Sequence, residues 1–195
     1  MSSRKTILAA IRANKPEVRN LPHLNFQANG SVDMLQQYKA SLEKNGGKLF
    51  VVENRSLIGD FIKKQFPDAK IVCSLLNDVE GNRSVTSSDD PHGLNNVDVA
   101  ILNSKIGVAE NAALWIDEPD LPQRVLPFIT QHLVVVINKS DLVPTMHQAY
   151  EMINFSESSY GVFIAGPSKT ADIEQSLVIG AHGARSLSVV LVDKE

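Results

Sequence analysis

The sequence predicts an α/β fold, a three-layer α/β/α sandwich with a mostly parallel, Rossmann-like sheet. Short apolar runs rich in valine, isoleucine and leucine alternate along the chain with segments whose apolar residues recur at helical spacing. The run at residues 133–137, LVVVI, has no polar position, which is typical of a strand buried on both faces of a parallel sheet. No internal repeat or low-complexity tract interrupts the alternation.

The composition indicates one domain and excludes several classes of protein. The chain has 195 residues, of which 43% are hydrophobic, so it can bury a full-sized core. A net charge of -3 provides no basic footprint for nucleic acid. The first apolar run, residues 7–11, is too short for a secretory signal, and no later run approaches the length of a membrane span. We therefore expect a cytoplasmic protein.

The single cysteine, Cys73, limits the metal and redox chemistry of this chain. One thiol cannot supply a disulfide framework, a four-thiolate zinc site or an iron–sulfur cluster. Its position in the apolar run at residues 70–75 predicts a buried, unreactive side chain. No second histidine lies at metal-ligand spacing from His182, so we do not expect a metal site.

Residues 1–29 are predicted to form a helix and an arm that precede the main domain. Residues 3–14 fit a helix capped at Ser3 that has one apolar face and a basic exposed side. Residues 15–29 contain prolines and show little periodicity. The helix can pack on its own domain or on a partner, and the sequence leaves both open. The apolar face of the helix consists of Ile7, Leu8 and Ile11, and its basic side consists of Arg4, Lys5 and Arg12.

Residues 30–195 are predicted to form a single α/β domain. Its first helix should end at Gly46, which permits a left-handed turn, and its second at Pro67, while Pro144 should occupy the first turn of a later helix. The polar residues 77–96 indicate a loop or a mobile flap. The expected helices are residues 31–45, 57–66, 122–130, 144–153 and 171–179, and the expected strands are residues 48–52, 70–75, 97–102, 113–117, 133–137, 161–165 and 187–192.

The first candidate site is the turn after the strand at residues 161–165. A helix at residues 171–179 would make this strand, the turn and the strand at residues 187–192 a crossover unit, and ligands usually bind beyond the carboxyl end of such a strand. Backbone amides and two hydroxyls could face an anion there. The turn lacks the spacing of a P-loop and of a dinucleotide fingerprint. Its residues are Gly166, Pro167, Ser168, Lys169 and Thr170.

The residues of this turn favour a purely structural interpretation when the motif alone is considered. Asp172 and Glu174 would lie in the first turn of the predicted helix, where they already satisfy its positive end. Ser168 or Thr170 would then only cap that helix. His182 and its neighbour Gly183 follow the helix in an exposed loop.

The second candidate is Glu110 with its neighbour Asn111. Small and apolar residues flank the pair on both sides, so we expect Glu110 to be buried, which would raise its pKa and suit it to proton transfer or nucleophilic attack. The alternative is a structural glutamate that accepts hydrogen bonds from loop amides. No Gly-x-Ser-x-Gly nucleophile elbow is present.

Several of these segments together resemble the lactate utilisation protein C family, the LUD-domain proteins. The segment AGPSKTADIE at residues 165–174, followed by GAHG at residues 180–183, is similar to that family's signature. VAEN at residues 108–111 and DLVP at residues 141–144 fall where the family carries an Ala-Glu turn and a Val-Pro segment. The basic start of the chain, RKTILAAIR, is similar to its N-terminal helix.

The resemblance implies both a fold and a function. The fold would be that of the ribose-phosphate isomerase, glucosamine-phosphate deaminase and coenzyme A transferase superfamily. The function would be a part in oxidising L-lactate to pyruvate beside two partner proteins, with the iron–sulfur clusters in a partner and no cofactor held by this chain. One departure concerns Ala112 and Ala113, because many relatives carry a glycine within this turn, and its loss removes freedom for a left-handed backbone.

Three functional hypotheses follow. In the first, the chain is a non-redox component of an L-lactate-oxidising complex that binds a small carboxylate or phosphorylated ligand. There the turn after residue 165 and Asn111 contact the ligand, Glu110 and Asp172 orient it or exchange protons, and His182 lies at the rim. In the second, it is a stand-alone acyl or coenzyme A transferase with Glu110 as nucleophile. In the third, it is a scaffold. A homo-oligomer is compatible with all three.

Overall fold

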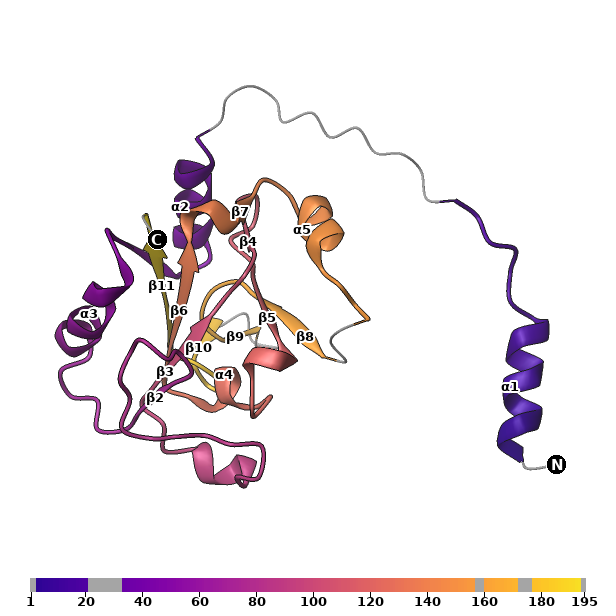
Figure 1. Cartoon of the computed structure of the whole chain (residues 1–195), viewed down its shortest axis with the longest axis horizontal. Helices are drawn as coiled ribbons and strands as arrows, with labels where there is room; N and C mark the ends of the chain where they lie inside the picture. The colour runs from indigo at the N-terminus through magenta and orange to yellow at the C-terminus, as the bar shows by residue number, and fades with distance from the viewer. Residues whose placement is uncertain (1–2, 21–32, 157–159, 172–176, 194–195) are drawn as a thin grey trace.

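A five-stranded parallel sheet lies at the centre of the structure, a computed structural model that describes residues 3–20, 33–156, 160–171 and 177–193 (Figure 1). The strand order is β1-β11-β6-β3-β2, and every neighbouring pair is parallel. The predicted α/β class with a mostly parallel sheet is therefore confirmed. The strands are β1 (Lys48–Val52), β2 (Val72–Ser74), β3 (Val99–Asn103), β6 (His132–Asn138) and β11 (Ser186–Val192).

A second, four-stranded sheet packs beside the first. Its order is β7-β4-β5-β8, with β4 parallel to β7 and antiparallel to β5, and β5 antiparallel to β8. The segments at residues 113–117 and 161–165 belong to this sheet, so the strands predicted from the sequence divide between two sheets. The strands are β4 (Gly107–Val108), β5 (Leu114–Asp117), β7 (Leu142–Val143) and β8 (Gly161–Ile164).

The described residues form five α-helices, and all but the first cover the outer faces of the two sheets. They are α1 (Ser3–Ala13), α2 (Met34–Lys44), α3 (Ile58–Gln65), α4 (Leu126–Ile129) and α5 (Met146–Met152), with short 3-10 helices at Arg55–Leu57, Pro91–Leu94, Glu118–Asp120 and Lys139–Asp141. Asp33 caps α2 by accepting from Leu35 N and Gln36 N, and Gly46 beyond its end has φ +84°, as predicted. Thr145 caps α5, so Pro144 precedes the helix and does not occupy its first turn.

The central strand β6 is buried on both faces, as its uninterrupted apolar run predicted. Val134 and Val136 pack toward α3, in a core cluster that includes Ile58 and Ile62. Leu133 and the other residues of the opposite face pack toward α2 and the second sheet, in the largest core cluster. A third cluster joins the second sheet to α5. Three apolar layers therefore lie between α3 and the parallel sheet, between the parallel sheet and the second sheet, and between the second sheet and α5.

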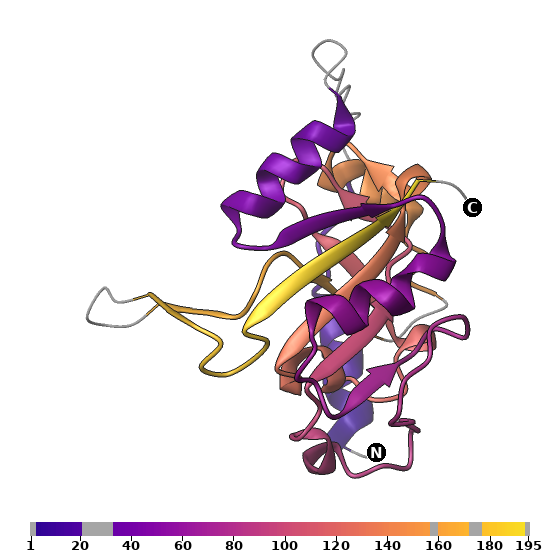
Figure 2. The ribbon, with the colours of Figure 1, turned by 90° about the vertical axis from the view of Figure 1, so that its left-hand side faces the viewer.

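The helix predicted at residues 171–179 is wrong. Residues Lys169–Ala171 (β9) and Leu177–Ile179 (β10) form an antiparallel hairpin that projects from the two sheets (Figure 2). Val178 and Ile179 are 45% and 50% exposed, so no core surface favours an amphipathic helix here, and both are β-branched residues that suit strands. The predicted crossover unit is therefore absent, because β8 lies in the second sheet and β11 in the parallel sheet.

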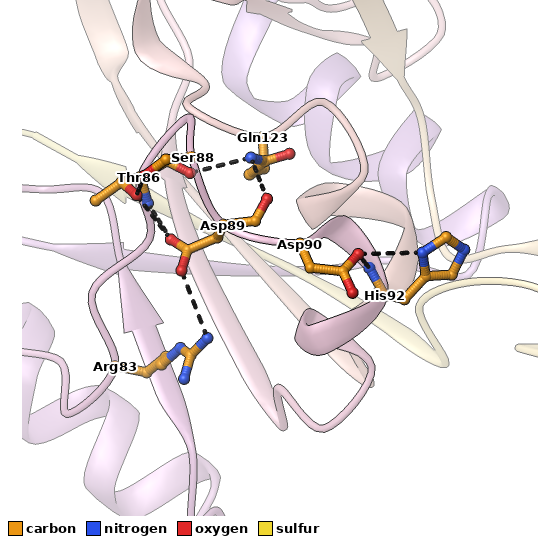
Figure 3. A network of polar contacts seen from close by, with 7 residues as sticks. All are labelled: Arg83, Thr86, Ser88, Asp89, Asp90, His92 and Gln123. Atoms are coloured by element: carbon orange, nitrogen blue, oxygen red, sulfur yellow. Dashed lines mark hydrogen bonds and ion pairs between the residues drawn. The ribbon is translucent and has the colours of Figure 1, made fainter.

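The polar segment at residues 77–96 is held in place by contacts within the segment and by hydrogen bonds from Gln123 (Figure 3). The Asp89 carboxylate accepts from the backbone N–H of Thr86 at 2.6 Å and lies 3.9 Å from the Arg83 guanidinium. The Gln123 amide donates to the carbonyl oxygens of Thr86 and Asp89, each at 3.0 Å. These contacts fasten the loop to the chain just before α4.

Helix α1 buries none of its residues against the rest of the described chain. None of its residues is buried, and Figure 1 shows it apart from both sheets. Its predicted apolar face is exposed, with Ile7 at 59% and Ile11 at 54%. Among the residues that are described, no helix is long and apolar enough to cross a membrane.

Candidate functional site

Five of the predicted site residues line one pocket between the two sheets. The pocket has a volume of about 260 Å³ and is formed where β8 ends and where β11 begins. Its walls are mostly apolar and include Phe128, Leu133 and Phe163. The Ser168 hydroxyl and the His182 imidazole are its polar side chains. The predicted residues that meet here are Gly166, Pro167, Ser168, His182 and Gly183.

Gly166 turns the chain from β8 into this pocket in a way that only glycine permits. Its φ is +100°, and a Cβ atom at this position would lie 2.6 Å from the carbonyl oxygen of Asn45. Pro167 is buried and lies against Gly46, the residue that follows the cap of α2. The end of α2 therefore sets the position of the turn.

Close approach of Ser168 and Gly183 holds the two walls of the pocket together. A Cβ atom on Gly183 would lie 2.9 Å from the Ser168 Cβ and 3.0 Å from its Oγ. The Ser168 N–H donates to the carbonyl oxygen of Ala184 at 2.9 Å, and the Gly180 N–H donates to the carbonyl oxygen of Ser168 at 2.9 Å. The GPS segment at residues 166–168 and the AHG segment at residues 181–183 thus form one structural unit.

The remaining residues of the predicted turn lie elsewhere. Lys169 and Thr170 belong to β9 and do not line the pocket. Asp172 and Glu174 fall outside the described residues. The helix terminus that they were expected to complement is not present, because Lys169–Ala171 is a strand. Anion binding at a helix N-terminus is therefore not available to this turn.

Glu110 does not join the pocket, and its predicted burial is wrong. The residues on either side of the turn are buried, but Glu110 itself is exposed. Its Oε1 accepts a hydrogen bond of 2.6 Å from the Met146 N–H at the start of α5. The carboxylate therefore has the structural role of the alternative interpretation, in which Glu110 accepts a hydrogen bond from a backbone amide. That amide belongs to the first turn of α5 and not to a loop.

Asn111 and the family-like segments around it are linked to the pocket through α2. The Asn45 amide donates to the carbonyl oxygen of Asn111 at 2.8 Å, while the Asn45 carbonyl contacts Gly166. The VAEN and DLVP segments lie side by side, since Ala109 N–H donates to Val143 O at 2.8 Å and Glu110 N–H to Pro144 O at 3.1 Å. The end of α2 therefore connects all the motifs, but only the GPS and AHG segments face the pocket.

Ala112 keeps a left-handed backbone although it is not glycine. Its φ is +58°, and its side chain is fully buried. Its N–H donates to Val108 O at 2.8 Å, and the Asn111 Oδ1 accepts from Ala113 N at 3.0 Å. The turn therefore adopts the conformation that a glycine would favour, at the cost of local strain.

A second and larger pocket, which the sequence did not predict, lies at the edge of the parallel sheet where its strands begin. Its volume is about 720 Å³, and residues at the amino ends of adjacent strands line it, among them Lys48, Asp98, His132 and Ser186. His132 Nδ1 lies 2.8 Å from Ser186 Oγ. The signal that could have revealed it is a polar residue at the start of each of four apolar runs, because amino ends of parallel strands share one edge.

Charge and burial set the state of His132 in this second pocket. Burial lowers its pKa below the ordinary value, the Arg185 guanidinium lowers it further, and Asp98 opposes both. The Asp98 carboxylate itself accepts from Lys70 N and Ile71 N at 2.8 Å each, which lowers its pKa. Across the described part of the chain, no group of three or more His, Cys, Asp or Glu residues is placed to hold a metal ion.

Known proteins resemble this chain both in sequence and in fold. The sequence model of the LUD domain matches residues 89–192, more than half of the chain. Lactate utilization protein C of Geobacillus sp. (strain WCH70) is 23% identical over 97% of this chain and 79% of its own length. The protein of the same name from Bacillus pumilus is 34% identical over 49% of this chain and 42% of its own length.

A solved structure supports the fold independently. The crystal structure of a DUF162 family protein from Deinococcus radiodurans superposes with a TM-score of 0.63, at 16% sequence identity, over 82% of this chain and 96% of that one. At this identity the likeness establishes the fold alone. Both signature segments at the first pocket, residues 165–174 and 180–183, lie within the matched LUD region.

Proposed function

Because this chain belongs to the LUD domain family, we propose that it is a cytoplasmic, non-redox component of L-lactate utilisation that binds a small anionic ligand. The curated relatives that align along nearly its whole length carry the name lactate utilization protein C. The observation that supports ligand binding is the pocket that the GPS and AHG segments form and that Ser168 and His182 both line. A small carboxylate such as L-lactate or pyruvate is the class of ligand we assign to it.

The chemistry of the pocket suits a small acid with an apolar carbon skeleton. Phe128, Leu133 and Phe163 supply apolar contact for the skeleton, while the Ser168 hydroxyl and the His182 imidazole can donate to a carboxylate. A volume of about 260 Å³ suits a molecule of a few carbon atoms. The chain contains a single cysteine and so cannot hold an iron–sulfur cluster by itself. We place the electron transfer in partner proteins that carry such clusters.

The test is genetic complementation in the native host. Deleting the gene should abolish or slow growth on L-lactate as sole carbon source while growth on pyruvate is retained. A Ser168→Ala, His182→Ala double variant should fail to restore growth on lactate. Lys169→Ala is the matched control, since Lys169 lies beside the pocket on β9 without lining it, and this variant should restore growth. Unchanged growth of the deletion strain on lactate would overturn the proposal.

Acyl transfer through Glu110 is the alternative. The exposed carboxylate is open to a coenzyme A thioester, and the Met146 N–H holds it in place. Attack of a carboxylate oxygen on the thioester carbonyl carbon would form a mixed anhydride and release the coenzyme A thiolate. Hydroxylamine should then convert Glu110 into a hydroxamate that mass spectrometry detects. An unmodified Glu110 after incubation with acetyl-coenzyme A and hydroxylamine would exclude this alternative for that substrate, and Glu110→Gln supplies the blank.

A further inference from the structure

The N-terminal helix α1 presents an apolar face that is exposed and that no described residue covers. Ile7, Leu8 and Ile11 are 59%, 41% and 54% exposed, and their spacing places them on one side of the helix. Ala9 lies on the opposite side. An eleven-residue helix of this kind gains most of its stability from packing its apolar face against another surface. We therefore expect this apolar face of α1 to pack against another apolar surface.

A second exposed apolar surface lies on α5 and the residues that follow it. Tyr150, Met152 and Phe155 are 52%, 56% and 59% exposed, and we call these three residues the aromatic patch. The Tyr150 and Phe155 rings are 6.0 Å apart, and Trp115 lies beneath them with its ring 6.5 Å from that of Phe155. A pocket of about 330 Å³ that Trp115 and Met152 help to line adjoins the patch. It offers a recess for a branched aliphatic side chain.

The charges around the two surfaces are complementary. Helix α1 contains three basic residues and no acidic one in the sequence SRKTILAAIRA. Two acids lie next to the patch, because the exposed Glu151 stands between Tyr150 and Met152 in the sequence of α5 and Asp117 lines the adjoining pocket. Lys105, the basic residue of that pocket, already pairs with Asp117 and with Asp120. The rim therefore keeps a negative balance that suits a basic helix.

The chain is long enough to bring the two surfaces together. About 20 residues separate α1 from α2, and an extended segment of that length spans at most ~66 Å. Helix α2, which the tether precedes, and helix α5, which carries part of the patch, both pack against β7 (Figure 1), so a segment of this reach can span the distance between them. A tether of this kind raises the local concentration of α1 at the patch to roughly the millimolar range.

We propose that α1 docks by its apolar face on the aromatic patch of its own chain. Ile7, Leu8 and Ile11 cover Tyr150, Met152 and Phe155, and the basic side chains of α1 lie over the acidic rim. No residue of the patch lines the pocket at Ser168, although Phe163 lines that pocket and its ring lies 5.6 Å from that of Tyr150. The docking settles which surface the N-terminal helix uses, a question that the sequence leaves open.

Disulfide trapping in the full-length protein tests the docking. Ile11→Cys is combined with Tyr150→Cys, and the native Cys73 does not interfere because it is buried. Under mild oxidation the pair should form an intramolecular disulfide, seen as a faster-migrating monomer on non-reducing gels. Its yield should not depend on protein concentration. Ala9→Cys with Tyr150→Cys is the matched control on the opposite helix face, and it should cross-link at least about tenfold more slowly.

A charge variant separates specific docking from chance collisions. Glu151→Lys should slow the Ile11–Tyr150 cross-link several-fold, and adding Arg12→Glu should restore much of the rate. Equal rates for the Ile11 and Ala9 pairs would overturn the proposal. So would a cross-link found only between two chains, whose yield rises with protein concentration, because the occupant would then be a second copy.

Discussion

Gly166 lies so close to Asn45 that a Cβ atom on the glycine would come within 2.6 Å of the asparagine carbonyl oxygen. The same Asn45 donates through its amide to Asn111 at 2.8 Å. One residue at the end of α2 thus positions both the turn that forms the pocket and the turn that follows β4. The packing of α2 against the domain is therefore a condition for the geometry of the candidate site.

Gly166→Ala should destabilise the protein. The added methyl group meets backbone atoms of Asn45, and φ +100° is unfavourable for alanine, so we expect a loss of about 1–3 kcal/mol in the free energy of unfolding. Thermal or urea denaturation measures it. Gly59→Ala is the matched control, because that glycine lies in α3 with nothing within 4 Å of the added atom, and it should leave stability unchanged or raise it by up to about 1 kcal/mol. Equal effects of the two variants would contradict the geometry.

Ala112→Gly and Ala113→Gly should differ although the two alanines are neighbours with similar burial. Each change removes a buried methyl group, worth about 0.8 kcal/mol, and adds freedom to the unfolded chain. Only Ala112 has a positive φ, and relief of that strain returns about 1–2 kcal/mol. Ala112→Gly should therefore be close to neutral in urea denaturation, while Ala113→Gly is clearly destabilising. A larger loss for Ala112→Gly would argue against a strained turn.

The His132 imidazole should make stability depend on pH. Its pKa in the folded protein lies below the ordinary 6.5, because burial and Arg185 disfavour the charged form. The unfolded chain therefore binds the proton first as the pH falls, and stability should decrease from just above pH 6.5 until the pH lies below the folded pKa. His132→Asn should flatten this part of the curve of unfolding free energy against pH. An unchanged slope in the variant would show that other groups cause it.

Cys73 should resist alkylation until the protein unfolds. Burial raises the pKa of its thiol to about 11, Arg83 lowers it in part, and Asp89 raises it slightly. At pH 8 the thiolate is scarce and the side chain has no exposed surface. Iodoacetamide should label the native protein hardly at all and label it fully in denaturant, as mass spectrometry can show. Rapid labelling of the native protein would contradict the burial of β2.

The strands of the parallel sheet could be predicted because they depend on local patterns, whereas the two-residue strands β4 and β7 of the second sheet were not predicted. Alternating apolar runs identified every strand of the parallel sheet, and the LVVVI run identified its buried centre. Strand partners could not be predicted, because β8 is a four-residue strand whose pairing depends on contacts distant in sequence. The hairpin at β9 and β10 was missed because apolar residues at positions 173, 177 and 178 fit a helix as well as a strand.

The candidate site could be predicted in part for a similar reason. The spacing of the glycines predicted residues 166–168 and 182–183 as site residues, and these do line one pocket. The exposure of Glu110 could not be predicted, because its neighbours are apolar and only the direction of the turn decides where its side chain points. The pocket around His132 needed the strand order, since its residues come from four separate segments.

The position of β11 bears on how the protein is made. This strand follows both of its neighbours in the sequence, yet it lies inside the sheet between β1 and β6 and pairs with both over most of its length. A ribosome releases it only after its two neighbours have been synthesised, so during translation both present unpaired edges to the cell. Nascent chains should thus depend on chaperone protection until β11 has emerged, and deletion of β11 should leave β1 and β6 without their shared partner.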